Sequence, residues 1–208
     1  MRSLKSDTPR PYRLRARADK QAETHRALAQ AAYELHTTIG PSKTTVSAIA
    51  DLAGVQRLTV YRHFPDQAAI FAACTAHAFA KDAPPVPEAW KTIPDPRDRL
   101  QTALAQLYGY YRRNQQLLSN LYRDAELPVV AAALTRRAGM LQQAVAILVK
   151  GWPAPTSGNE RLRRAAIGHA LDFSSWLSLA GTQGLTDEEA IEAMIGFVAL
   201  AGAGPRAK

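Results

Sequence analysis

Helical periodicity runs through most of the chain, and proline and glycine interrupt it at intervals. One face of residues 19–39 carries four apolar residues at helical spacing, Leu28, Ala31, Ala32 and Leu35. Gly40 and Pro41 then end this segment, because neither continues a helix readily. Alternation of apolar and polar residues, which is typical of strands, is almost absent. We therefore predict an all-α protein.

Five prolines between residues 82 and 96 mark the natural boundary between a smaller and a larger domain. Beyond them the periodicity predicts a helix over residues 97–126, with a bend or break near Asn114. Three more helices are expected, over residues 128–150, 160–183 and 187–201. The larger domain should therefore be a helical bundle.

The charge balance favours a polyanionic partner. Lys and Arg outnumber Asp and Glu by 26 to 18, which gives a formal net charge of +8. Seven of the first twenty residues are basic, and we expect residues 1–18 to form a flexible arm. This arm either follows a nucleic-acid backbone or minor groove, or it is a tail without a role.

Cysteine usage and hydropathy exclude several other classes. Cys74 is the only cysteine, which rules out an intrachain disulfide and a cysteine-rich zinc site. No apolar run reaches the length of a membrane span, and no signal peptide is recognisable. We expect a cytoplasmic protein that has no cofactor, metal or membrane partner.

Residues 44–63 have the pattern of a helix-turn-helix. Thr44 or Thr45 caps a short helix, Gly54 turns the chain, and a second short helix runs from Gln56 to His63. The apolar residues suit a buried seam between the two helices and comprise Val46, Ile49, Ala50, Val55, Val60 and Phe64. The remaining residues of the second helix then face outward.

This outward face suits DNA. Arg57, Thr59 and Arg62 are the expected base readers, because Arg can donate two hydrogen bonds to guanine and the Thr methyl can touch thymine. Tyr61 and His63 are expected phosphate donors. The exposed amides at the helix start near Thr44 and Thr45 are expected to hold a further phosphate.

The stretch TTVSAIADLAGVQRLTVYRHFPDQAAIF, residues 44–71, resembles the helix-turn-helix of TetR (tetracycline repressor) family regulators, and the likeness extends over residues 19–81. Residues 93–126 and 182–198 also look like regulatory domains of one branch of that family. Family members often have a small residue at the position of Gln56, Gly at that of Leu58 and Lys at that of Gln67. Gln56 and Leu58 are therefore expected to alter base preference, and Gln67 removes a phosphate contact.

The resemblance implies a homodimer with two roles in each subunit. A homeodomain-like three-helix DNA-binding domain would occupy residues 19–82, and a bundle for ligand binding and dimerisation would occupy residues 83–208. The last two helices would dimerise as a four-helix bundle, with the candidates Leu171, Leu179, Ile191, Met194, Ile195 and Val198. Two-fold symmetry predicts a roughly palindromic operator in double-stranded DNA.

An unknown small hydrophobic or aromatic effector would bind inside the bundle and release the DNA. Its candidate contacts are mostly aromatic and comprise Tyr108, Tyr111, Leu121, Tyr122, Met140, Trp152, His169, Phe173 and Trp176. Ordinary core packing is the competing interpretation for each of them. The family usually represses transcription, so repression is the expected output.

Two other functions compete with a ligand-released repressor. A DNA-binding regulator without a small-molecule ligand would have a fully packed bundle core. An enzyme would need a convergent site, and its best material is His169 with Asp172 one turn away, plus His77 and Glu126 elsewhere. No third convergent group is identifiable, so we expect no catalytic residue and no enzyme.

Overall fold

The computed structural model describes residues 10–153 and 160–203, and every element of regular structure among them is helical. These residues divide into two compact units between Lys81 and Asp82. The prediction of an all-α chain is confirmed. Within the described residues, every helix is too short or too polar to cross a membrane.

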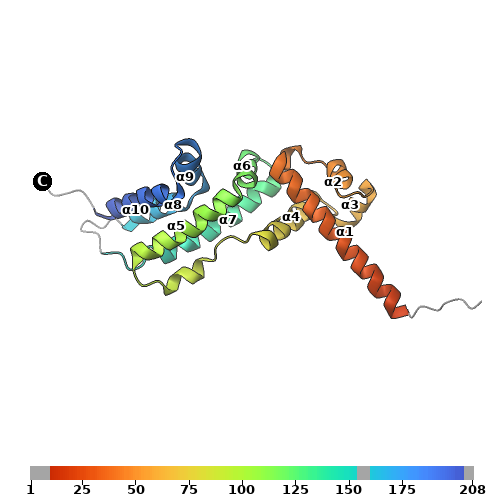
Figure 1. Ribbon diagram of the computed structural model, residues 1–208, viewed down its shortest axis with the longest axis horizontal. Helices are drawn as coiled ribbons and strands as arrows, with labels where there is room; N and C mark the ends of the chain where they lie inside the picture. The colour runs from red at the N-terminus through yellow and green to blue at the C-terminus, as the bar shows by residue number, and fades with distance from the viewer. Residues whose placement is uncertain (1–9, 154–159, 204–208) are drawn as a thin grey trace, which may run out of the picture. The chain divides into compact units, whose positions relative to one another are not determined.

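The described part of the N-terminal unit consists of α1 (Arg10–Thr38), the 3₁₀ turn η1 (Pro41–Lys43), α2 (Val46–Leu52), α3 (Arg57–His63) and α4 (Gln67–Lys81). The helix α1 packs against α2 and α4, and α2 packs against α3 (Figure 1). Their shared core consists of Leu28, Ala31, Ala32, Ile49, Ala50, Val60, Phe64, Ile70 and Cys74. The apolar face expected on residues 19–39 is the centre of this core.

The first helix begins nine residues earlier than expected, at Arg10 rather than Asp19. The basic arm expected at residues 1–18 is therefore helical from residue 10 onward, and residues 1–9 lie outside the described part. Arg, Leu and Ala make up most of residues 10–18 and are good helix formers. Pro11 lies in the first turn, where its missing N–H breaks no helical hydrogen bond.

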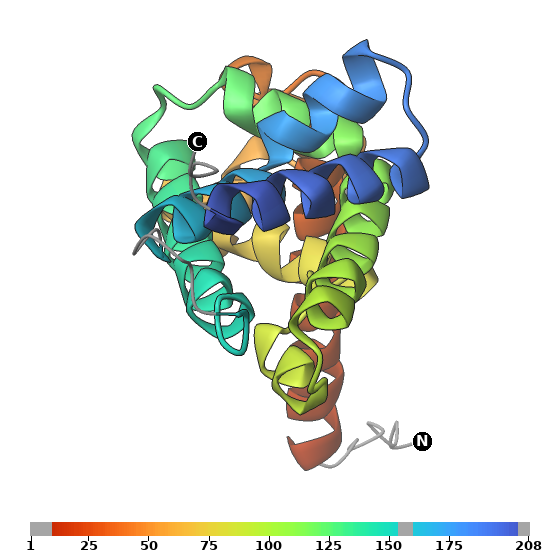
Figure 2. The ribbon, with the colours of Figure 1, turned by 90° about the vertical axis from the view of Figure 1, so that its left-hand side faces the viewer.

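The described part of the C-terminal unit consists of the 3₁₀ segment η2 (Pro87–Thr92), α5 (Pro96–Arg113), α6 (Gln115–Arg123), α7 (Pro128–Leu148), α8 (Glu160–Leu171), α9 (Phe173–Trp176), the π-helical turn η3 (Leu177–Thr182) and α10 (Asp187–Ala203). The helix α10 lies across α5 and α8 (Figure 2). The helix α7 packs against α5, α6 and α8.

Two breaks in this bundle bear on the expected helices. Asn114 separates α5 from α6, so the expected break near that residue is confirmed. The single helix expected over residues 160–183 is instead divided at Asp172. The Asp172 carboxylate accepts a hydrogen bond from the Ser174 amide at 2.7 Å, which starts a new helix in the manner of an N-cap.

Arg99 is buried at the end of the bundle, with 7% of its surface exposed. Its guanidinium donates to four backbone carbonyl oxygens, those of Ile93 (2.8 Å), Pro94 (2.8 Å), Lys150 (2.8 Å) and Ile147 (3.4 Å). These carbonyls belong to the segment before α5, to the last turn of α7 and to the residues that follow α7. One side chain therefore joins two segments that lie about 50 residues apart in sequence.

We expect Arg99→Met to lower the free energy of unfolding by about 3 kcal/mol, because it leaves buried carbonyl oxygens without donors. Urea unfolding followed by far-UV circular dichroism measures this loss. The matched control is Arg97→Met, a change to an exposed residue of the same helix, which should cost less than about 0.5 kcal/mol. Equal losses in the two variants would contradict the role of Arg99.

Candidate DNA-binding interface and regulatory core

The turn between α2 and α3 is fixed at both ends of α2. At its start the Thr45 hydroxyl oxygen accepts from the Ala48 amide at 3.1 Å, so Thr45 is the cap. Thr44 instead donates its hydroxyl to the carbonyl oxygen of Gly40. At the other end Gly54 adopts a φ of 66°, a conformation in which a side chain would be strained. Both features set the angle at which α3 leaves the turn.

Burial of two residues decides which face of α3 points outward. Val60 is 0% exposed and Phe64 is 3% exposed, and both pack in the N-terminal core. Leu58 and Tyr61 lie on the other side, with 68% and 46% of their surfaces exposed. An exposed leucine on a recognition helix suits contact with a thymine methyl group.

Arg57 and Tyr61 form a pair on this outward face. Arg57 Nη2 donates to the Tyr61 hydroxyl at 3.1 Å, and the guanidinium carbon lies 5.7 Å from the centre of the Tyr61 ring. The pair holds the long Arg57 side chain in one orientation at the start of α3. Gln56 precedes Arg57 as the N-cap residue of α3, and its side chain makes no capping hydrogen bond.

A hollow of about 360 Å³ between α1 and α3 gathers polar and basic side chains. It is lined by Arg17, Lys20, Gln21, Thr24, Thr59, Arg62 and His63. The last three were expected at the interface, and the first four were missed. The missed residues share the spacing i, i+3, i+4 and i+7, which places them on one helical face. Arg17 was missed because the helix was expected to begin at residue 19, whereas Lys20, Gln21 and Thr24 were already inside the expected helix but were not assigned to the interface.

His63 is neutral over more of the pH range than an ordinary histidine. Its pKa is lowered, first by burial and then by the positive charges of His25 and Arg62. The His25 and His63 rings lie 6.0 Å apart between their centres. A nearby phosphate would oppose this shift, because it favours the charged imidazolium.

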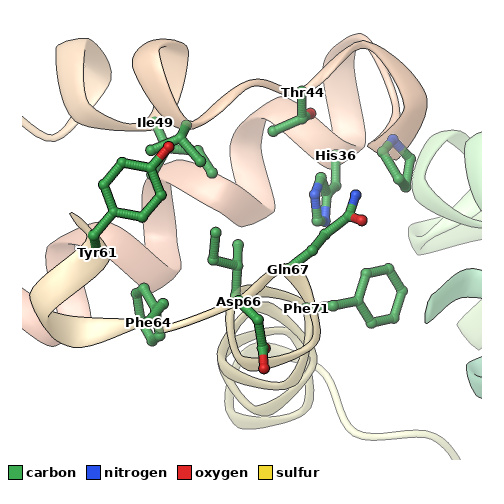
Figure 3. A pocket seen from close by; sticks show the side chains of 11 residues that line it. His36, Thr44, Ile49, Tyr61, Phe64, Asp66, Gln67 and Phe71 are labelled. Atoms are coloured by element: carbon green, nitrogen blue, oxygen red, sulfur yellow. The ribbon is translucent and has the colours of Figure 1, made fainter. Parts of the chain in front are cut away.

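A second, smaller hollow of about 180 Å³ lies under α2, α3 and α4 (Figure 3). Thr44, Tyr61 and Gln67 contribute its polar lining, beside the apolar side chains of Ile49 and Phe71. Gln67 is the first residue of α4, where a helix end favours an anion. Gln67 therefore offers an uncharged amide where related proteins often carry a lysine.

The candidate effector residues do not form one group. Tyr108, Tyr111, Phe173 and Trp176 are at most 1% exposed. The two tyrosine hydroxyls donate to the carbonyl oxygens of Ala170 (2.9 Å) and Leu171 (2.5 Å), at the end of α8. These four residues are therefore packed and hydrogen-bonded within the bundle core.

The other candidates lie elsewhere. Leu121 and Tyr122 are half-buried against this core, and the Tyr122 ring lies 5.2 Å from that of Phe173. Trp152 donates to the Leu148 carbonyl oxygen near the end of α7. Met140 is 42% exposed, and His169 is exposed on α8. Arg137 of α7, whose guanidinium lies over the Tyr111 ring, was missed as a candidate. It lies at helical spacing with the buried apolar residues of α7.

Four of the expected dimer contacts are already buried within the subunit. Leu171, Ile191, Ile195 and Val198 are between 0% and 8% exposed and belong to the core of the C-terminal unit. Leu179 and Met194 are half-buried. The apolar residues that α8 and α10 leave exposed are Leu162, Phe197 and Leu200. The helices α8 and α10 thus keep an outer apolar surface, but with other residues than expected.

The residues considered for an enzymatic site do not come together in the structure. His169 pairs with the Ser175 hydroxyl at 3.1 Å, and Asp172 caps α9. His77 belongs to the other unit and packs against Tyr33. Among the residues that the structure describes, no three metal-ligating side chains gather.

Comparisons with known proteins agree with this arrangement. The family model described as "Bacterial regulatory proteins, tetR family" matches residues 28–74. Two Mycobacterium tuberculosis proteins, from strains CDC 1551 / Oshkosh and ATCC 25618 / H37Rv, are both described as uncharacterized HTH-type transcriptional regulators. Each is 23% identical to this chain over 188 residues, which cover 88% of this chain and 92% of the relative.

Solved structures show the same fold. A TetR-like transcriptional regulator from Rhodococcus sp. RHA1 matches with a TM-score of 0.61 and 20% identity, over 86% of this chain and 96% of that one. A TetR-family regulator from Syntrophomonas wolfei matches with a TM-score of 0.62 and 16% identity, over 90% and 99%. The predicted helix-turn-helix fold is confirmed, because residues 28–74 match the family model and the solved structures of these regulators share the fold.

Protonation of His63 should strengthen DNA binding as the pH falls from about 7.5 to about 5.5, because it adds a positive charge beside the phosphates. Fluorescence anisotropy of a non-specific duplex at fixed salt measures the gain. His63→Gln should reduce this gain in affinity. His77→Gln should retain it, because His77 does not line the hollow between α1 and α3. An unchanged gain in His63→Gln would contradict this role.

Proposed function

We propose that this chain is a repressor of the TetR family that binds a palindromic operator as a homodimer, a proposal supported by the family match over residues 28–74 and by the shared fold. A small molecule bound in the C-terminal unit releases it from the DNA. The protein acts in the bacterial cytoplasm, where its operator is found.

One observation carries the DNA-binding half of this proposal. The basic residues Arg17 and Lys20 of α1 line the same hollow as Thr59, Arg62 and His63 of α3. A protein that reads DNA needs side chains that reach base edges and charges that fix its position on the phosphates. The two helices supply both on one face.

The roles divide by position along α3. Arg57, Thr59 and Arg62 read base edges, and the exposed Leu58 touches a thymine methyl group. Tyr61, His63 and the amides that follow Thr45 contact phosphates, and Gln56 adjoins the bases at the helix start. Arg17 and Lys20 hold the backbone beside them, which replaces the charge that Gln67 does not provide.

Dimerisation uses the outer apolar surface of α8 and α10. Phe197 and Leu200 are 45% and 75% exposed, and Leu162 of α8 is 46% exposed. Half-buried Met194 and Leu179 extend this surface. The buried candidates of the same helices stabilise the subunit, because they hold α10 against α8 and α5. Two-fold symmetry then presents two recognition helices about one turn of DNA, roughly 10 base pairs, apart.

A second candidate function is regulation without a small molecule. The complete burial of Tyr108, Tyr111, Phe173 and Trp176 favours it, since a packed core leaves an effector no preformed space among these residues. An effector would have to open this region and stabilise the opened form. Screening for compounds that release bound DNA separates the two functions.

The test of the proposed function is binding to the DNA upstream of the protein's own gene. Fluorescence anisotropy at about 150 mM salt should show tight binding to that duplex and weak binding to a scrambled one. The stoichiometry should be two subunits per site. Equal binding to both duplexes would contradict recognition of this site.

Arg57→Ala should weaken operator binding by about 1–3 kcal/mol and relax specificity at one base position in each half-site. The matched variant Lys20→Ala should weaken binding to all duplexes alike and lower the salt slope by about one. Anisotropy titrations against operators substituted at single positions measure both effects. If Arg57→Ala also weakened all duplexes alike, Arg57 would be a phosphate contact.

Phe197→Arg combined with Leu200→Arg should convert the dimer to a monomer, because two charges would enter an apolar interface. Both residues are exposed in the subunit, so the fold should survive. Sedimentation velocity measures the state. Val86→Arg, which changes another exposed apolar residue, is the control and should stay dimeric. A dimeric double variant would place the interface elsewhere.

A further inference from the structure

Arg137 is a charged residue on the inward face of α7. It lies at helical spacing with five apolar residues that are buried or half-buried: Val130, Leu134, Leu141, Ala144 and Leu148. An arginine in such a stripe is unusual, because its charge is costly to remove from water. The contacts that Arg137 makes must therefore explain its place on this face of α7.

Two of the three nitrogen atoms in the Arg137 guanidinium lack acceptors. These atoms, Nε and Nη2, are buried, and neither has a hydrogen-bond partner among the residues that the structure describes. Arg99 in the same unit shows the usual solution, since its three nitrogen atoms all donate to carbonyl oxygens. A buried cation with unmet donors is stable only if the rest of the protein holds it in place.

The neighbouring carboxylate is already engaged. The pKa of the Tyr122 hydroxyl is raised, first by burial; the Arg137 charge lowers it and the Asp172 charge raises it, so both charges lie near this side chain. However, the Asp172 carboxylate caps α9 through the Ser174 amide at 2.7 Å and forms no ion pair with Arg137. The described protein therefore offers this guanidinium no anion.

Aromatic rings surround the unpaired charge. The guanidinium carbon lies 5.1 Å from the centre of the Tyr111 ring. That ring meets Phe173 edge-on at 5.4 Å and Trp176 at 5.8 Å. The hydroxyls of Tyr111 and Tyr122 also lie within hydrogen-bonding reach of the guanidinium. Nε and Nη2 nevertheless have no acceptor among the described residues, because stacking on Tyr111 engages only the face of the group. Two donors of Arg137 are thus left without an acceptor by the described residues.

We propose that Arg137 is the anion-binding residue of the effector site, and that the effector is a small organic acid whose carboxylate pairs with Arg137 while its apolar body packs against Tyr111, Tyr122 and Phe173. This inference rests on the proposed function, because it names the chemical class of the effector. An arginine fork matches a carboxylate in two parallel hydrogen bonds. Tyr122 of α6 and Arg137 of α7 are half-buried, and these two helices pack together. Because Tyr111 and Phe173 are closely packed, the acid binds by opening space between the two helices.

Binding without DNA tests this proposal separately from DNA release. Isothermal titration calorimetry of the full chain uses three carboxylates, namely benzoate, phenylacetate and octanoate, each beside its neutral amide. At least one acid should bind at least about tenfold more tightly than its amide, because a charge-assisted pair is worth more than a neutral one. Arg137→Met should remove this preference, and Arg137→Lys should keep it in weaker form.

The matched control is Arg136→Gln, which removes a charge from the exposed neighbour on the same helix and should bind as the native chain does. The melting temperature of ligand-free Arg137→Met should equal or exceed that of the native chain, because the variant no longer buries an unpaired charge. A decrease of more than about 5 °C would instead make Arg137 a structural residue and overturn the proposal.

Three binding results would also overturn it: no carboxylate binds, each acid binds no more tightly than its amide, or the preference for the acid survives in Arg137→Met. If an acid binds through Arg137 but does not release operator DNA, the anion site stands and the release step of the proposed function fails. If operator binding fails but acids bind through Arg137, the DNA-recognition half of that function fails alone.

Discussion

Two helices of seven residues each carry the candidate recognition surface, and neither is long enough to be stable alone. They exist because Ile49 and Val60, at 2% and 0% exposure, pack against the alanine-rich face of α1. This seam is the constraint on which the rest of the N-terminal unit depends. Small residues in it let the helices approach closely, and the turn at Gly54 then sets their angle.

The same packing determines which side chains of α3 can contact DNA. Because Val60 and Phe64 point inward, residues one and two positions away must point outward or sideways. Arg62 and His63 thereby reach the hollow that α1 lines with Arg17. Core packing and recognition are thus two faces of one short helix, and a change to the seam would disturb both.

Much of this unit could be predicted from the sequence, because the signals are local. A cap at Thr45, a glycine at position 54 and apolar spacing lie within a few residues of the elements that they define. The start of α1 was predicted too late, since two prolines and many charges masked a stretch of good helix formers. The break at Asp172 was missed because a capping carboxylate within a helical pattern resembles an ordinary polar position.

Arg99 and Arg137 show a property that cannot be predicted from neighbouring residues in the sequence. Both are arginines within helices of the same bundle. Arg99 is buried, and Arg137 is half-buried with its Nε and Nη2 atoms buried. Arg99 meets the carbonyl oxygens of residues about 50 positions away, so its burial is compensated by backbone that only the fold brings near. Arg137 meets aromatic rings and no acceptor for two of its nitrogen atoms. Periodicity can place an arginine on a buried stripe, but whether its donors are satisfied depends on distant segments. The difference between a structural arginine and one that awaits a ligand is therefore a property of the folded bundle.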